Sequence, residues 1–178
     1  EGQGLGARLR ALGAWAASVA CDSADSSDAS MLLRRGQPIT GVLHAAGAAD
    51  KGLLVKLEAH SMAWMFAPKA GGAWHLHCAV AMAPLEVQAL FSSVASGLGN
   101  VGQANYAAAN AFLDACALSR QASGVAACSM QWPLVGGAGM GAPAFAALAE
   151  RQLSIVGMAG ISLEQYAASL CTQISARL

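Results

Sequence analysis

Short apolar runs alternate with longer segments of helical pattern along most of the chain, and no other feature constrains its fold as strongly. Each run has the length of one strand and ends in small or polar residues, as a strand buried in a parallel sheet does. The runs predict strands at residues 15–20, 39–44, 87–92 and 126–130. The remaining patterns predict helices at residues 7–12, 27–35, 105–119 and 145–151, and a last helix that a Ser162–Gln165 capping box begins. Residues 53–74 are predicted to be mostly helical, with interruptions around Pro68 and the Gly71-Gly72 pair. We therefore predict an α/β fold, a parallel sheet with crossover helices.

Small or hydroxyl-bearing residues stand where two of the predicted strands end. Ala45, Ala46 and Gly47 follow the second strand, and side chains of this size let a ligand approach the backbone closely. Ser93 follows the third strand. Open α/β sheets bind their ligands at the carboxyl ends of the strands, so we expect a binding site at this edge.

Composition excludes several classes of function. The 178 residues include 10 basic and 10 acidic ones, which gives no indication of nucleic acid or an anionic membrane as a partner. Only 11% of the residues are charged and 56% are hydrophobic, which predicts an ample core and a surface that neighbouring domains cover. The uncharged stretch 87–113 contains several amide side chains and glycines, so we predict no membrane span.

Cysteine and histidine usage points to an intracellular protein without a metal. The five cysteines form no CxxC pair and the first residues do not resemble a signal peptide, which favours reduced thiols in the cytoplasm or an organelle. His75 and His77 lie beside Cys78, but alternate positions do not share a helix face and no fourth ligand is suitably spaced.

Four side chains form a candidate reaction centre. Tyr106 and Asn110 are four residues apart in a predicted helix and therefore share one face of it, while Ser93 ends the preceding strand. A serine hydroxyl and a phenol can both act on one carbonyl oxygen while hydride reaches the carbon. The phenol needs a nearby ammonium, and Lys69 is the candidate among only three lysines. Spacing alone leaves open a structural tyrosine with a capping serine and a helix asparagine.

Three segments resemble the active-site signature of polyketide synthase ketoreductases, a branch of the short-chain dehydrogenases. They are LFSS at 90–93, GNVGQANY at 99–106 and AAANAFLD at 107–114. In that family an asparagine follows the tyrosine by four residues, and the lysine comes from the helix before the serine strand. Ala67-Pro68-Lys69 resembles that lysine segment. Further similarity, including Trp132 with Gly139-Met140, extends from about residue 7 to 175.

The resemblance implies a fold, a reaction and a set of contacts. Residues 1–178 would be a single, partial ketoreductase domain with a Rossmann-like, doubly wound parallel sheet that lacks its first βαβ segment. It would use NADPH to reduce a β-ketoacyl thioester, carried on the phosphopantetheine of an acyl carrier protein, beside other synthase domains. Ser93, Tyr106, Lys69 and Asn110 would be catalytic. The cofactor would contact Asp22 at its adenine, Ala45, Ala46 and Gly47 at the adenosine ribose, Lys69 and Tyr106 at the nicotinamide ribose, and Pro133 at the nicotinamide.

Some positions depart from the family pattern. Pro133 and Val135 stand where the family has glycine and often tryptophan, and the stereochemical signatures that would fall on residues 49–51 and on Leu98 are both missing. No strand precedes Gly2, so we interpret residues 2–6 as a flexible terminus and expect the isolated chain to bind NADPH poorly and to expose a sheet edge. A stand-alone short-chain dehydrogenase, a truncated or non-catalytic structural subdomain and a fatty-acid synthase origin remain alternatives.

Overall fold

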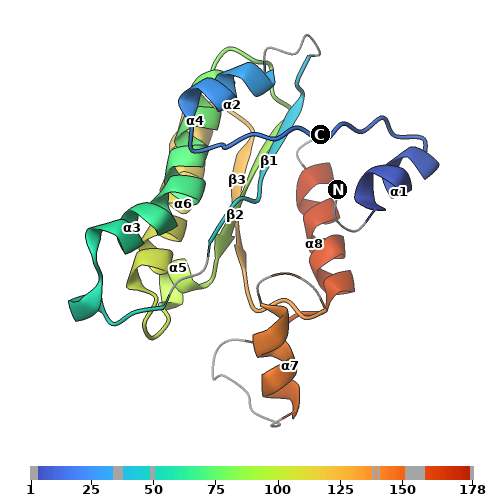
Figure 1. The fold of residues 1–178 in the computed structure, drawn as a ribbon. Helices are drawn as coiled ribbons and strands as arrows, with labels where there is room; N and C mark the ends of the chain where they lie inside the picture. Colours follow the sequence, from blue (N-terminus) through green and yellow to red (C-terminus); the bar gives the residue numbers. More distant parts are fainter. Residues whose placement is uncertain are drawn as a thin grey trace.

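The computed structural model describes residues 4–33, 38–48, 51–137, 139, 141–150 and 159–176, which fold around a parallel sheet (Figure 1). The sheet has three strands in the order β1-β2-β3: Gly41–His44, Val87–Ser93 and Ala127–Trp132. Gly41 pairs with Val87 at one end, and Ser93 pairs with Trp132 at the other. The carboxyl ends of all three strands therefore lie at one edge, as the α/β prediction requires.

Helices cover both faces of this sheet. Figure 1 shows α2, α4 and α6 on one side and α8 on the other. The helices are α1 (Leu5–Ala11), α2 (Ser26–Leu33), α3 (Ala59–Phe66), α4 (Gly72–Ala79), α5 (Ala95–Leu98), α6 (Ala104–Ala122), α7 (Ala142–Glu150) and α8 (Leu163–Ser175). A 3-10 turn at Leu54–Lys56 precedes α3, and a π turn at Ala67–Gly71 joins α3 to α4.

The core is divided by the middle strand, whose side chains alternate between two apolar clusters. Leu90 points toward the helical layer, where it packs with Ala73, Leu113 and Ala117. Ala89 points the other way and packs with Cys128 and Met130, against which α8 places Leu170. The small residues on α4 and α6 let both helices approach β2 closely. β2 is thus buried on both faces, and this packing fixes the position of Ser93 at its carboxyl end.

Most sequence predictions agree with these elements. The strands expected at 39–44, 87–92 and 126–130 are confirmed with shifts of one or two residues at their ends. The Ser162–Gln165 capping box is present at the start of α8. Gly124, with a φ of 77°, follows α6 as expected for a residue in the left-handed region after a helix. α5 lies between β2 and α6, where the sequence predicted no regular element.

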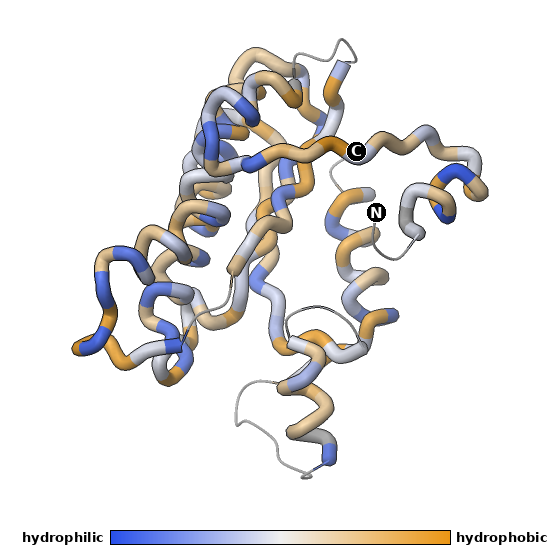
Figure 2. The backbone as a smooth tube through the Cα atoms, viewed as in Figure 1, coloured by the Kyte–Doolittle hydropathy of each residue, from blue (hydrophilic) through white to orange (hydrophobic). Residues whose placement is uncertain are grey.

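The strand predicted at residues 15–20 is also wrong. This segment is an extended coil without secondary structure, and the Trp15 side chain is 85% exposed. Figure 2 shows that the run is hydrophobic although it crosses the surface between α1 and α2. Within the described residues no strand lies beside it to accept its ladder hydrogen bonds, and an apolar run alone cannot form a strand.

Candidate active site

Lys69 enters the protein interior from the π turn. Pro68 lacks the N–H that a regular helix needs here, and its ring would collide with the carbonyl one turn earlier, so the helical path widens locally. The Lys69 side chain is only 4% exposed. Its Nζ donates a hydrogen bond to the Phe91 carbonyl of β2 at 2.9 Å and lies 5.7 Å from the centre of the Tyr106 ring. The structure therefore brings Lys69 and Tyr106 together beside the middle strand.

Burial makes the Lys69 ammonium lose its proton more easily than an exposed lysine does. Loss of water lowers its pKa from the ordinary value of 10.5 to about 8, while the negative charge of Asp114 opposes this shift. The Phe91 carbonyl and the face of the Tyr106 ring both stabilise the ammonium form. A lysine in this state can exchange its proton near neutral pH, which a surface lysine cannot do.

His44 supports the lysine segment from β1. Its Nε2 lies 3.1 Å from the Lys69 carbonyl oxygen, and burial lowers the pKa of the ring. The neutral ring therefore donates from Nε2, which makes His44 a structural support of the lysine segment. Gly72 makes this approach possible, because a Cβ there would lie 2.9 Å from His44 Cε1 and 2.6 Å from Ser23 Oγ.

Asn110 is held one turn after Tyr106 on α6. Its Nδ2 donates to the Tyr106 carbonyl at 2.8 Å, and the residue has no exposed surface. The Asn110 Oδ1 is buried and has no hydrogen-bond partner among the described residues. A buried carbonyl oxygen without a partner is a favourable place for an ordered water.

Ser93 lies at the carboxyl end of β2, next to the first turn of α5. Its Oγ accepts a hydrogen bond from the Ala95 amide at 3.2 Å, which leaves the hydroxyl proton available for another acceptor. The preceding residue, Ser92, is buried and donates to the Asn110 carbonyl at 3.2 Å. Among the described contacts, Ser93 is linked to the Lys69–Tyr106–Asn110 group through Ser92 rather than directly.

The residues expected at the cofactor lie at the same edge of the sheet or near α2. Ala45, Ala46 and Gly47 follow β1, and Pro133 follows β3. Asp22 instead lies before the turn that leads into α2, where its Oδ1 accepts from the Ala24 amide at 2.9 Å. Residues 49 and 50 of the stereochemical signature lie outside the described residues, as does Met140.

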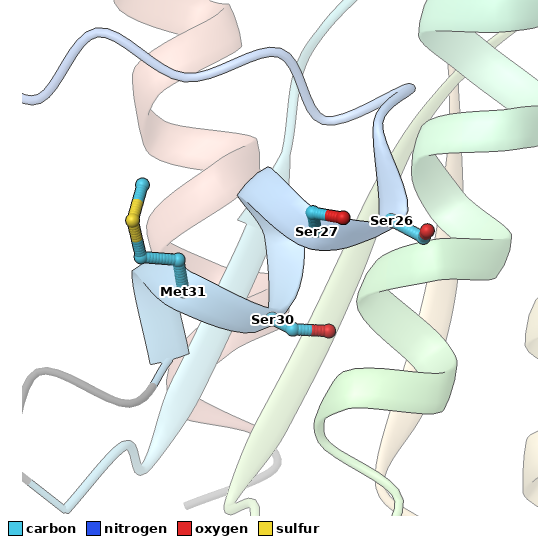
Figure 3. A pocket seen from close by; sticks show the side chains of 4 residues that line it. All are labelled: Ser26, Ser27, Ser30 and Met31. Carbon is cyan, nitrogen blue, oxygen red and sulfur yellow. The ribbon is translucent and has the colours of Figure 1, made fainter.

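A shallow hollow lies along α2 (Figure 3). It is lined by Ser26, Ser27, Ser30 and Met31, so it contains no ionisable group and none of the candidate reaction residues. In the described part of the chain, no group of three or more metal-ligating side chains gathers. No helix there has the length and hydrophobicity that crossing a membrane requires.

Asp114 is a polar residue of this region that the sequence reasoning missed. It accepts hydrogen bonds from Ser129 Oγ and from Gln131 Nε2 on β3. Its spacing was the available signal, because Asp114 continues the series of Tyr106 and Asn110 at intervals of four residues along α6. These three side chains lie along one side of the helix, next to the ends of β2 and β3.

The parallel sheet, its flanking helices and the serine strand before a tyrosine–asparagine helix define an α/β domain of the short-chain dehydrogenase type. Residues 2–137 match the model of the family described as the KR domain, and the chain belongs to this family, the ketoreductase domains of modular polyketide synthases. The resemblance noted in the sequence and the predicted fold class are both confirmed.

Relatives and solved structures agree on this assignment. Polyketide synthase GfsA of Streptomyces halstedii is 50% identical over 134 residues, which are 73% of this chain and 2% of GfsA. The spectinabilin polyketide synthase system protein NorB of Streptomyces orinoci is 43% identical over 160 residues, 88% of this chain and 7% of NorB. A solved structure of A-type ketoreductases from a modular polyketide synthase superposes with a TM-score of 0.86 at 34% identity. The match covers 97% of this chain and 37% of that one.

Proposed function

We propose that this domain reduces a β-ketoacyl thioester to the β-hydroxyacyl thioester with NADPH, as one step of polyketide synthesis. The observation that carries the proposal is the buried Lys69 ammonium, which lies under the Tyr106 ring while Asn110 binds the same turn of α6. A structural tyrosine would not need a lysine desolvated beside it, because burying that charge costs stability. The structural alternative for these side chains is therefore disfavoured.

The residues at the strand ends fit a dinucleotide cofactor. The coil after β1 offers the small side chains of Ala45, Ala46 and Gly47, of which the first and last are exposed, so a ribose can approach the backbone. Asp22 would contact the adenine and Pro133 the nicotinamide, while Lys69 would bind the nicotinamide ribose together with Tyr106. When bound, NADPH supplies the hydride that the chain itself cannot provide.

Each side chain of the site would then have a separate role at the carbonyl oxygen of the substrate. The free hydroxyl proton of Ser93 would orient and polarise it, and the Tyr106 hydroxyl would donate the proton. The Lys69 ammonium would stabilise the phenolate that remains. Asn110, through its unpaired Oδ1, would hold a water that returns a proton from solvent.

The proposed substrate and partners follow from the relatives, which are large polyketide synthases. The chain spans 7% or less of the two relatives described above, so the partners lie elsewhere in such proteins. We propose that an acyl carrier protein presents the β-ketoacyl group on phosphopantetheine, and that α7, the next helix after β3, covers the substrate. Neighbouring synthase domains would cover exposed apolar side chains such as Trp64 and Trp74.

The test is Tyr106→Phe in the full-length protein, assayed by NADPH oxidation with a β-ketoacyl thioester. The substitution removes the proton donor and keeps the ring over Lys69, so turnover should fall by about 100-fold or more. Tyr166→Phe is the matched control, because Tyr166 is the second of only two tyrosines and packs its ring on Trp132, with centroids 4.2 Å apart. Turnover retained by Tyr106→Phe would show that another group protonates the oxygen. A wild-type protein without turnover would instead indicate a structural domain.

A further inference from the structure

A polar cluster lies between α6 and the ends of β2 and β3, next to the proposed reaction centre. Asp114 is its centre: Oδ1 accepts from Ser129 Oγ, and Oδ2 accepts from Gln131 Nε2 at 2.8 Å. The same Gln131 Nε2 lies 3.0 Å from Ser96 Oγ on α5. One carboxylate therefore connects α6 to β3 and, through Gln131, to the short helix that follows Ser93.

This carboxylate remains ionised although it is half-buried. Loss of water raises the pKa of Asp114, but hydrogen bonds, chiefly from Ser129, Ser96 and Gln131, outweigh that effect and hold it below its ordinary value. Asp114 is thus a fixed negative charge across the neutral and basic range. These three residues belong to α5 or β3, the elements next to Ser93.

Asp114 also acts on the lysine of the site. Its charge raises the pKa of Lys69, against the lowering effect of burial. In the described part of the chain it is the sole carboxylate on the strands and helices that pack against the Lys69 segment. Glu58, before α3, is exposed and paired with His60. The other ionisable side chains on those elements are His44 on β1, His75, His77 and Cys78 on α4, and Tyr106, Cys116 and Arg120 on α6.

We propose that Asp114 is a positioning residue of this ketoreductase, whose carboxylate anchors the short helix α5 that follows Ser93 and supplies a fixed negative charge to the site. The inference rests on the proposed function of Lys69 and Tyr106 and adds a role to a residue that touches neither substrate nor cofactor. Two separate effects follow from it, one on the geometry of Ser93 and one on the pH at which the site loses its proton.

The sign of the pH effect follows from the charges. A nearby carboxylate favours the ammonium of Lys69, so it keeps the proton on that group. Removing the carboxylate charge makes Lys69 lose its proton more easily. The high-pH limb of the reduction rate must then move to lower pH. His44 does not contribute to this limb, because its pKa lies below the ordinary value of 6.5.

Asp114→Asn in the full-length protein removes the negative charge and nearly preserves the shape of the side chain. The amide keeps an oxygen for Ser129, but it carries no charge and places an N–H₂ against one of its donors. We expect the high-pH limb of kcat to move down by about half a pH unit or more, together with a fall in kcat of about tenfold. An unmoved limb would overturn the electrostatic role, and an unchanged kcat would overturn the anchoring role.

Two control variants identify the cause. Ser129→Ala removes one hydrogen bond and keeps the charge, so it should lower kcat modestly and leave the limb in place. Glu86→Gln removes an exposed carboxylate just before the amino end of β2 and should change neither quantity. A limb that moves as far in either control as in Asp114→Asn would overturn the inference. If Asp114→Asn does not fold, Gln131→Leu is the alternative variant, because it breaks the hydrogen bond to Ser96 without changing the charge. In this variant kcat should fall while the high-pH limb stays in place. An unchanged kcat would refute the anchoring role.

Failure of this inference and failure of the proposed function give different results. If Tyr106→Phe abolishes turnover while Asp114→Asn behaves as wild type, the reaction assignment stands and Asp114 has no positioning role. If Tyr106→Phe retains turnover, the reaction assignment is lost, and Asp114 then has no proton donor to act upon.

Discussion

Replacing Lys69 with methionine should stabilise the fold while it removes activity. Methionine is a flexible, unbranched side chain of similar length to lysine and carries no charge, so it can follow the same course from the π turn toward β2. The lysine residue is 4% exposed, so its ammonium has lost much of its water. The buried charge lowers the free energy of unfolding, and the substitution measures by how much.

The magnitude follows from the pKa of the lysine. A shift from 10.5 to about 8 corresponds to roughly 3 kcal/mol of destabilisation in the charged form, at about 1.4 kcal/mol for each pH unit. Methionine also loses the hydrogen bond to the Phe91 carbonyl, which is worth about 1 kcal/mol. We therefore expect Lys69→Met to increase the free energy of unfolding by about 1–2 kcal/mol at pH 7.

The pH dependence gives the decisive assay. The lowered pKa penalises the folded state fully below about pH 8, and the penalty disappears as pH rises toward 10.5. Between these values wild type should gain stability relative to Lys69→Met. Hydrogen exchange of β2 and α6 amides, at pH 7 and pH 9.5, reports this locally in a large protein. Lys56→Met, at an exposed site, is the control. A variant that is less stable than wild type by the same amount at both pH values would refute the reasoning.

Two further substitutions test the packing around the site. Gly72→Ala should destabilise the domain by about 1–3 kcal/mol in thermal unfolding, because the new Cβ would meet Ser23 Oγ and His44 Cε1, whereas Gly97→Ala, with no atom within 4 Å, should be neutral or stabilising. A harmless Gly72→Ala would mean that α4 can move away from β1. Ser162→Ala removes the capping box of α8 and should cost about 1 kcal/mol, seen as faster hydrogen exchange in its first turn. Ser169→Ala, at an exposed position of the same helix, should leave this exchange as it is.

The sequence predicted those elements whose signal is local. The strands at β1, β2 and β3 are continuous apolar runs, and the ends of α6 and α8 carry Gly124 and Ser162, whose effects act within one turn. The run at 15–20 has the same local signal but failed, because a strand also needs a neighbour and none of the described segments provides one. α5 was missed because four residues contain too little periodicity to detect.

In the candidate site, too, the sequence predicted the features that depend on local spacing and missed those that depend on the fold. Tyr106 and Asn110 were placed on one helix face by spacing, and Lys69 was selected because lysines are scarce. Sequence could not show that the Phe91 carbonyl binds the lysine, since backbone groups carry no residue-specific signal. Asp114 was overlooked because its partners Ser129 and Gln131 lie on a later strand, and only the register of β2 with β3 brings them to α6.

The π turn at Ala67–Gly71 has a consequence for how chains of this kind are compared. It adds one residue to the helical path, so α3 and α4 are out of phase by the angle of one residue, about 100°. A helical wheel drawn across Ala59–Ala79 would assign the wrong face to half of its residues. An alignment that shifts this segment by a single position would likewise exchange Lys69, which faces the interior, for a neighbour.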